Sequence, residues 1–210
     1  KTTTTAMIAE IMIEAKKDPT VVVGSFLGKQ KDNFVSGMSE YFVVEACEYR
    51  RSFLNLSPQI LVIVNIDNDH LDYYGNLKNI QTAFNEMARK VPKDGFIICN
   101  PSDKRVKPAL KGVRGIIIDY TKTKADIALP IPGRHNIENA KAALAVAKLV
   151  GIDEATVLGA LKEFHGTWRR TEYKGVMKCG SLVYDDYAHH PTEIQATLAG
   201  FRAMYPKKRI

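Results

Sequence analysis

Apolar runs alternate with segments of helical spacing along most of the chain. Apolar residues, many of them β-branched, fill 21–23 (VVV), 41–46 (YFVVEA), 60–65 (ILVIVN), 95–100 (GFIICN) and 115–119 (GIIID), which predicts five strands. Runs that are apolar at successive positions are typical of strands buried on both faces of a sheet. Helical spacing predicts an amphipathic helix over 6–17, further helices over 76–90, 136–150 and 153–164, and a short helix after Asp103. Strands separated by helices predict an α/β fold with a mostly parallel sheet and flanking helices.

The pattern changes after Gly166. Residues 176–186 (VMKCGSLVYDD) predict a hairpin with its turn at Cys179-Gly180, and Pro191 opens a helix that runs to about Met204. Arg209-Ile210 predicts the start of another strand. We therefore expect a domain boundary near Trp168, with domains at 1–168 and 169–210, each truncated.

Composition narrows the class of protein. The 210 residues carry a formal net charge of +7, but the basic residues are dispersed and match no nucleic-acid-binding motif, so we expect small anions rather than nucleic acid as partners. No apolar run is long enough to predict membrane insertion. The three cysteines (Cys47, Cys99 and Cys179) are too far apart to predict a zinc site or a disulfide framework, which favours a cytoplasmic location.

The first residues, Lys1 to Thr5, resemble the end of a phosphate-binding loop. Lys followed by Thr at a helix start is the last part of the pattern G-x-x-x-x-G-K-[ST]. Free N–H groups and the positive end of the helix dipole would attract phosphate there, and a Thr hydroxyl could bind Mg²⁺. Since the glycines of the pattern would precede Lys1, we expect the chain to begin inside this loop. A Thr-rich helix start is the alternative reading.

Two predicted strands are followed by side chains suited to metal or catalysis. Glu45 ends the strand 41–46, and 65–70 (NIDNDH) follows the next one. Ligands bind outside the carboxyl ends of strands in open α/β sheets. Glu45 is therefore a candidate Mg²⁺ ligand, and His70 a candidate metal ligand or general base. A solvated acid and an Asx-rich turn are the alternatives.

Three later segments are also rich in polar side chains. Residues 133–140 (GRHNIENA) open a helix, in which Asn136 could act as the cap and Asn139 lies one turn further along the same face. Asn side chains can also bond to adenine. Arg169-Arg170 lies at the predicted domain junction, where Arg can reach a phosphate. In 185–191 (DDYAHHP), adjacent histidines on a strand point to opposite faces, which favours a substrate or nucleotide contact over zinc.

Together these segments resemble the ATP-dependent Mur ligases of peptidoglycan synthesis. The resemblance spans essentially the whole chain, through KTTTTA, VVEACEYRRSFL, NIDNDHLDYY, GRHNIENAKAA, GTWRRTEYKG and DDYAHHPTE in that family's order and spacing. It implies a P-loop-type central ATPase domain, followed by the first β–α unit of a Rossmann-like C-terminal domain. It also implies that an N-terminal domain for the uridine nucleotide and most of the C-terminal domain lie outside this chain, which alone would be inactive.

Within the family, EACEYRRSFL and DDYAHHPTE are most similar to the members that add the first amino acid. The implied reaction uses ATP to convert the lactyl carboxylate of UDP-N-acetylmuramic acid to an acyl phosphate, which the amine of L-alanine attacks. Two alternatives stay open: a relative that recycles murein tripeptide, and a nucleotide-binding module without ligase activity. Such a reaction suits a site closed between domains, because the acyl phosphate must be kept from water.

The resemblance also implies roles for individual residues. Lys1 would hold the β- and γ-phosphates of ATP, with Thr2 and Thr3 beside it, and the Mg²⁺ ligands would be Thr2, Glu45 and His70. ATP or its adenine would contact His135, Asn136, Asn139, Arg170 and Asp186. The catalytic set would be Lys1, Glu45, His70 and Arg170, and the substrate side would include Asn65, His189 and His190.

Three positions depart from the family pattern or stay unassigned. Cys47 stands where the family commonly has Asp, and Thr171 stands where an aromatic residue usually follows the two arginines. Lys78 lies in the region where some members carry a carbamoylated Lys, but no motif assigns it that role.

Overall fold

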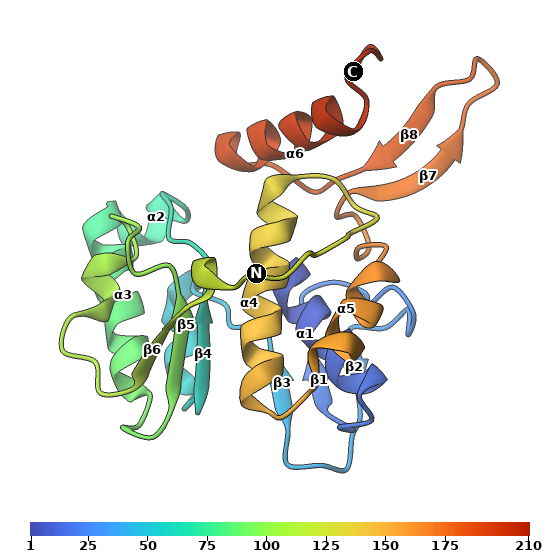
Figure 1. Cartoon of the computed structure of the whole chain (residues 1–210). Helices are drawn as coiled ribbons and strands as arrows, with labels where there is room; N and C mark the ends of the chain where they lie inside the picture. The colour runs from blue at the N-terminus through green and yellow to red at the C-terminus, as the bar shows by residue number, and fades with distance from the viewer. The chain divides into compact units, whose positions relative to one another are not determined.

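The computed structural model describes residues 1–210, which form two compact units (Figure 1). The first unit combines Lys1–Glu45 with Asp126–Ile210, and the second is Ala46–Ala125. Each unit has its own small sheet, so each is described separately.

The sheet of the first unit has the order β2-β1-β3. The central strand β1 (Thr20–Val22) pairs in parallel with β3 (Phe42–Val44) and antiparallel with β2 (Phe34–Val35). Because β1 and β3 are parallel and in register, with Val21 opposite Val43, the residues that follow them meet at one edge of the sheet. Gly24 and Glu45 are therefore neighbours.

The helix α1 (Thr2–Glu14) packs against α4 (Arg134–Leu149) and α5 (Glu154–Lys162). Nine residues of α1 are buried, and seven of them, from Ala6 to Met12, follow one another without interruption. The predicted helix over 6–17 is therefore present, but it spans Thr2–Glu14 and is mostly buried instead of amphipathic. Small alanines on α4 let the two helices approach closely.

The C-terminal part of this unit is a hairpin followed by a helix. The strands β7 (Glu172–Val176) and β8 (Leu182–Asp185) pair antiparallel, and α6 spans Pro191–Met204. Gly180 has a φ of +84°, a left-handed value that glycine adopts without strain, so the turn lies where the sequence predicted it. Arg209 and Ile210 form no strand, in contrast to the prediction.

The second unit is built on three parallel strands in the order β4-β5-β6. The strands are β4 (Ile60–Ile63), β5 (Phe96–Cys99) and β6 (Ile116–Asp119), and the helices are α2 (Leu71–Tyr74) and α3 (Leu77–Lys90). Three 3-10 helices complete the unit: η1 (Tyr49–Asn55), η2 (Lys107–Leu110) and η3 (Tyr120–Lys122).

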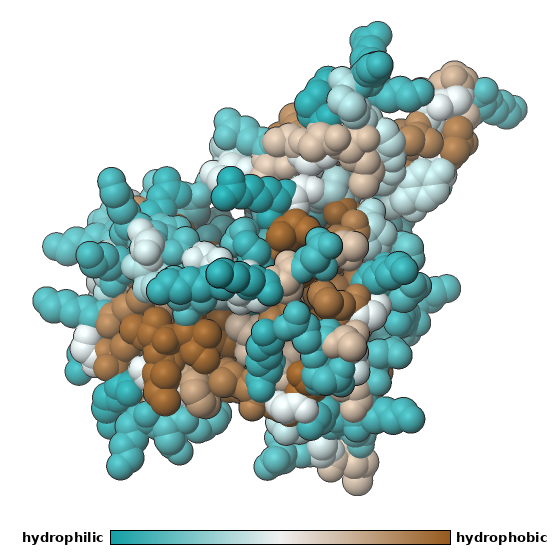
Figure 2. Space-filling model, in the orientation of Figure 1, coloured by the Kyte–Doolittle hydropathy of each residue, from teal (hydrophilic) through white to brown (hydrophobic).

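The apolar face of α3 forms the core of this unit with η1, η2 and the sheet. Ile80 and Met87 are buried at the helical spacing that the sequence predicted, whereas Leu77 and Phe84 are only partly buried against this core. Figure 2 shows hydrophobic surface in the region where Figure 1 draws β6, one of the two edge strands of this sheet. Ile116 and Ile117 of β6 are exposed.

The predicted α/β fold with mostly parallel strands and flanking helices is confirmed, since three of the four strand pairs in the two α/β sheets are parallel. The short helix expected after Asp103 is the 3-10 helix η2. None of the helices is both long and apolar enough to cross a membrane.

Candidate functional site

A hydroxyl and a carboxylate meet at the start of α1. Thr2 Oγ1 donates a hydrogen bond of 2.8 Å to Glu45 Oε1, and the backbone N–H of Gly24 donates one of 2.7 Å to Glu45 Oε2. Glu45 follows β3 directly and Gly24 follows β1, so the carboxylate lies at the carboxyl edge of the sheet, beside the N-terminus of α1. Two predicted residues, 43 positions apart, are thus brought together.

The glycine at position 24 leaves room for the Glu45 carboxylate in this position. A Cβ at that position would lie 2.9 Å from Glu45 Oε2, closer than carbon and oxygen atoms tolerate. Lys1 is the N-cap residue of α1 and is exposed, and Thr3 is half-buried on the first turn. The phosphate-binding residues predicted from the sequence therefore lie together at one helix end, where free N–H groups favour an anion.

The donors at this point fit Mg²⁺. Hydroxyl and carboxylate oxygens are the ligands that a small hard cation prefers, and Thr2 and Glu45 offer one of each within 2.8 Å. If a cation bound to both oxygens, its contacts with them would replace the hydrogen bond between Thr2 and Glu45.

The asparagines of α4 connect to the same helix. Thr4 Oγ1 donates a hydrogen bond of 3.0 Å to Asn139 Oδ1, and Asn139 Nδ2 lies 3.4 Å from Asn136 Oδ1. Asn136 is buried, and its amide donates to the carbonyl of Pro132 at 2.7 Å. Asn136 is not the helix cap, contrary to the sequence interpretation: α4 begins at Arg134 and Gly133 occupies the cap position.

His135 follows at the start of α4 and is half-buried. Burial lowers the pKa of its imidazole, and the charge of Asp186 opposes that shift only partly. Gly133 allows the ring to lie back over the helix start, since a Cβ on Gly133 would come within 2.5 Å of His135 Cε1. His135 and Asp186, both predicted to contact nucleotide, are therefore close enough to interact electrostatically.

The side chain of Asp186 connects the segment after Trp168 to the segment that follows β8. Its Oδ2 accepts hydrogen bonds from the backbone N–H of Thr171 at 2.7 Å and from the Thr171 hydroxyl at 3.1 Å. Its Oδ1 accepts from the N–H of Ala188 at 2.8 Å. Both carboxylate oxygens are thus engaged within the protein, so the structure gives Asp186 a positioning role that the sequence did not reveal.

The two arginines of the junction differ. Arg169 pairs with Asp185 at 3.3 Å and its guanidinium lies 5.1 Å from the centre of the Tyr187 ring. Arg170 lies 5.4 Å from the same ring and has no acidic partner. Arg170 is therefore the arginine of the two whose charge is not balanced by an acidic side chain, and its contact with a phosphate stays a prediction. The neighbours Arg169 and Thr171 both have left-handed backbone, with φ of 55° and 56°.

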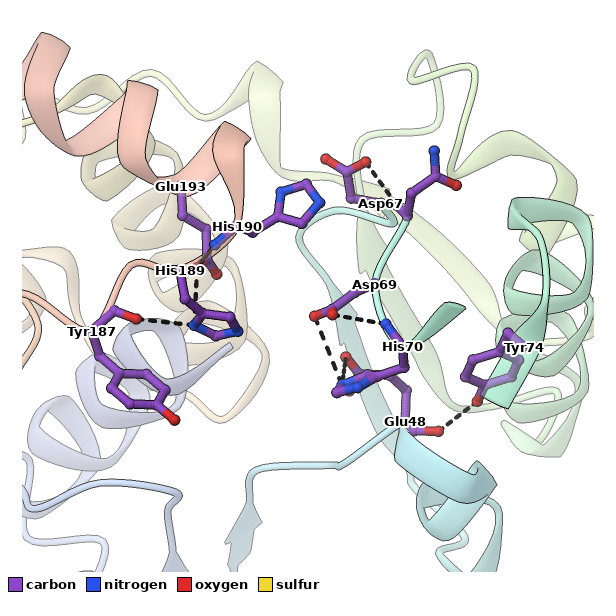
Figure 3. A network of polar contacts seen from close by, with 10 residues as sticks. Glu48, Asp67, Asp69, His70, Tyr74, Tyr187, His189, His190 and Glu193 are labelled. Atoms are coloured by element: carbon purple, nitrogen blue, oxygen red, sulfur yellow. Dashed lines mark hydrogen bonds and ion pairs between the residues drawn. The ribbon is translucent and has the colours of Figure 1, made fainter. Parts of the chain in front are cut away.

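The two histidines of 185–191 have different surroundings (Figure 3). His189 Nδ1 lies 3.0 Å from the carbonyl of Tyr187. His190 caps α6: its Nδ1 accepts from the N–H of Thr192 at 3.3 Å, while Glu193 accepts from the N–H of His190. This capping box gives His190 a structural role in addition to the predicted substrate contact.

In the second unit, His70 meets two carboxylates (Figure 3). Its Nε2 lies 3.8 Å from Oε1 of Glu48 and 3.7 Å from Oδ2 of Asp69, and the Tyr49 ring centre is 4.9 Å from the imidazole. Glu48 is buried, and the Tyr74 hydroxyl donates to its carbonyl at 2.5 Å. One ligand atom from each of Glu48, Asp69 and His70 lies within 4.8 Å of the others, which fits a divalent cation.

The backbone around His70 is strained. His70 has a φ of 52°, and Arg50 and Arg51 in η1 have φ of 50° and 61°, values that cost free energy in residues other than glycine. Such strain is concentrated at functional sites. Asn65, predicted to lie near the substrate, is exposed and its side chain has no hydrogen-bond partner.

Sequence reasoning missed Glu48 and Asp69. The signal for Glu48 was its position three residues after Glu45, with Tyr49 beside it. Asp69 directly precedes His70, and its Oδ1 accepts from the His70 N–H at 2.8 Å, which holds the turn in place.

Comparison with known proteins identifies the family. Residues 1–126 match the sequence model of the Mur ligase middle domain, and residues 169–210 match that of the Mur ligase glutamate ligase domain. The chain belongs to the Mur ligase family. The resemblance described from its motifs is thereby confirmed.

Individual relatives support the same placement. The chain is 44% identical to a UDP-N-acetylmuramate–L-alanine ligase of Caldicellulosiruptor saccharolyticus, over all of this chain and 52% of that protein. The crystal structure of the UDP-N-acetylmuramate-alanine ligase from Thermotoga maritima superimposes with a TM-score of 0.82 at 30% identity, covering 99% of this chain and 53% of that one. A murein peptide ligase from Psychrobacter arcticus gives 0.74 at 28%, covering 100% and 54%. The chain thus spans about half the length of the relatives it matches.

Proposed function

We propose that this chain forms the ATP-using part of a ligase that joins L-alanine to the lactyl carboxylate of UDP-N-acetylmuramic acid. The observation that carries the proposal is the Thr2–Glu45 pair at the N-terminus of α1, a hydroxyl and a carboxylate held 2.8 Å apart beside a phosphate-binding helix end. The identity of 44% to a protein named for this reaction supports the choice of substrates.

In this proposal the phosphates of ATP lie at the start of α1. Lys1 and the free N–H groups of the first turn, including Thr3, bind the β- and γ-phosphates, and Thr2 and Glu45 hold Mg²⁺. A divalent cation there would neutralise the charge that develops on the transferred phosphoryl group. Arg170 has no acidic partner and supplies a further positive charge to the phosphates.

The second unit contributes His70 with Glu48 and Asp69. We assign this group to a divalent cation on the side of the carboxylate substrate, since its donor set has two carboxylates and an imidazole. His135, Asn136 and Asn139 line the start of α4, where we place the adenine. Asn65, His189 and His190 are assigned to the substrate side.

The proposed reaction has two steps. The lactyl carboxylate attacks the γ-phosphorus of ATP, which releases ADP and leaves an acyl phosphate. The amine of L-alanine then attacks the acyl carbon, an amide bond forms and phosphate leaves. The chain's contribution is to bind and orient the phosphates and to balance their charge, because phosphoryl transfer needs positioning and electrostatic stabilisation above all.

Three further assignments accompany the proposal. The boundary between the central and C-terminal domains is placed near Trp168, which the start of the second family match at residue 169 supports. The reaction is placed in the cytoplasm, a setting in which Cys47, Cys99 and Cys179 would stay reduced. None of the three forms a disulfide. Residues 1–210 alone are expected to catalyse no ligation, because the relatives named for the reaction are about twice as long.

The test is product formation by the full-length protein that carries this chain, with ATP, Mg²⁺ and UDP-N-acetylmuramic acid. L-alanine and murein tripeptide are offered in parallel. Ligation of L-alanine supports the proposal. Preference for the tripeptide would assign the protein to the recycling reaction of a murein peptide ligase, and ATP binding without either product would make it a nucleotide-binding module.

A further inference from the structure

A hollow of about 640 Å³ opens on the second unit. None of the residues that line it belongs to the candidate site described above. It is lined by Pro101, Lys104, Lys107, Pro108, Leu110 and Lys111. The lining thus combines three ammonium groups with apolar surface from two prolines and a leucine. It offers neither a carboxylate nor a side-chain hydroxyl or amide to a ligand.

The three lysines are unpaired. Two other basic residues of this unit are engaged: Arg105 forms an ion pair with Asp67, and Lys90 donates to the carbonyl of Leu54. Lys104, Lys107 and Lys111, in contrast, are exposed and have no acidic partner in the structure. Their charge is therefore directed to solvent or to a ligand.

The hollow is built on a fixed backbone. Val106 and Ala109 are fully buried between the lysines, and they anchor η2 to α3. The side chain of Asn85 donates to the carbonyls of Ala109 and Lys111 at 2.9 Å and 2.8 Å, and Gln81 donates to the carbonyl of Arg105 at 2.9 Å. These contacts hold the backbone that carries the three lysines.

The charge of the chain is concentrated in this region. Residues 89–114 contain eight Lys and Arg residues but only two acids, Asp94 and Asp103, in a chain whose formal net charge is +7. The excess of basic over acidic residues is therefore high in this segment, although most of the 30 Lys and Arg residues lie elsewhere in the chain.

This chemistry selects an anion with an apolar part. All three cations of the hollow are lysines, whose compact ammonium groups act as point charges and can bind a phosphate group. Lysines around apolar surface are also the combination that attracts proteins to anionic lipid. We propose that the hollow binds a phosphate-bearing amphiphile, and that its source is anionic phospholipid at a membrane surface.

The experiment measures co-sedimentation of the chain with vesicles of phosphatidylcholine, with and without phosphatidylglycerol. We expect binding only to the vesicles that contain phosphatidylglycerol, and weaker binding as salt is raised. Since each lysine near an anionic surface contributes about a fivefold factor in binding, the triple variant K104Q/K107Q/K111Q should bind about a hundredfold more weakly. K104Q alone should bind about fivefold more weakly, and it tests the proposal should the triple variant fail to fold.

The control variant is K162Q/K178Q/K207Q, which removes the same charge from exposed lysines elsewhere. Equal loss of binding in both triple variants would overturn the proposal, because net charge alone would then explain the attraction. Displacement from the vesicles by inorganic phosphate, but not by sodium chloride at the same ionic strength, would reassign the hollow to free phosphate. Absence of binding to phosphatidylglycerol overturns the lipid source outright. The ligase reaction does not enter this measurement, so its outcome is independent of the proposed function.

Discussion

The hydroxyl of Thr4 donates a hydrogen bond of 3.0 Å to the side-chain oxygen of Asn139, across 135 positions of sequence. This contact ties the first turn of α1, where we place the phosphates of ATP, to the start of α4, where we place its adenine. Asn139 in turn donates to Asn136, which donates to the carbonyl of Pro132. Two helix ends are thus fixed relative to each other by one chain of polar contacts.

Replacing Thr4 by Val should break this connection and leave the shape of the side chain almost unchanged. Asn139 Oδ1 then loses its donor in a largely buried setting, and we expect the free energy of unfolding to fall by about 1–3 kcal/mol. Urea unfolding of the chain measures the change. Thr5→Val on the same helix is the matched control, because the Thr5 hydroxyl has no hydrogen-bond partner, and it should change stability by less than about 0.5 kcal/mol. Equal effects at the two positions would contradict the role given to the Thr4–Asn139 bond.

Glu45→Gln tests the proposed Mg²⁺ site in the full-length protein. The amide keeps an acceptor for the Gly24 N–H but loses the negative charge and weakens the hold on the cation. We expect the rate of ligation to fall about a hundredfold, or about 3 kcal/mol, with a higher Mg²⁺ concentration needed for half-maximal rate. Glu40→Gln, an exposed acid before the same strand, should leave both quantities unchanged. A Glu45→Gln enzyme with a normal Mg²⁺ requirement would remove Glu45 from the site.

The parallel strands and the main helices could be predicted from the sequence. Strands buried on both faces appear as successive apolar residues, and helices appear as apolar residues at helical spacing. The two-residue strand β2 (Phe34–Val35) was missed because it is too short to show a period. Arg50 and Arg51 adopt a left-handed backbone conformation. It could not be predicted, because neither residue is a glycine or asparagine, the types that usually adopt it. Such conformations are imposed by the surrounding fold.

Site residues that belong to a sequence motif could be predicted. Contacts that depend on the folded structure were harder to predict. Thr2 and Glu45 were both expected to bind Mg²⁺, and their side chains form a hydrogen bond. Asn136 was expected as a cap, but Gly133, with a φ of +106°, takes that position. Pro191 and Glu193 could have revealed that His190 caps α6, since Glu at the third helical position is part of a capping box.

His70→Ala tests the cation site of the second unit by a binding measurement that needs no ligation. Titration of the chain with Mn²⁺, followed by electron paramagnetic resonance, counts the free ion. Even a residue that only supports a metal ligand affects affinity about 10–100-fold, so His70→Ala and Glu48→Gln should each weaken Mn²⁺ binding by at least about tenfold.

The control for that titration is His165→Ala, an exposed histidine in the other unit, which should leave Mn²⁺ affinity as it was. A site at Thr2 and Glu45 could also bind the ion, so Glu45→Gln is combined with each variant to isolate the second unit. Mn²⁺ affinity that is insensitive to both His70→Ala and Glu48→Gln would show that this group is held together without a cation.

The buried imidazole of His135 should make the stability of the chain depend on pH. Burial lowers its pKa below the ordinary value of 6.5, so the unfolded chain binds the proton more readily than the folded one. The folded state therefore has its full stability above about pH 6.5 and loses it as pH falls through the lowered pKa. Urea unfolding between about pH 7.5 and pH 5 should show this loss, and in His135→Gln the part due to this group should disappear.

Carboxylates add their own pH dependence to every variant, so the informative quantity is the difference in the free energy of unfolding between wild type and His135→Gln. His165→Gln, at an exposed position, should follow the wild-type curve. If wild type and His135→Gln lose stability in parallel, the imidazole of His135 is protonated as easily in the folded chain as in the unfolded one, and the electrostatic picture of the start of α4 fails.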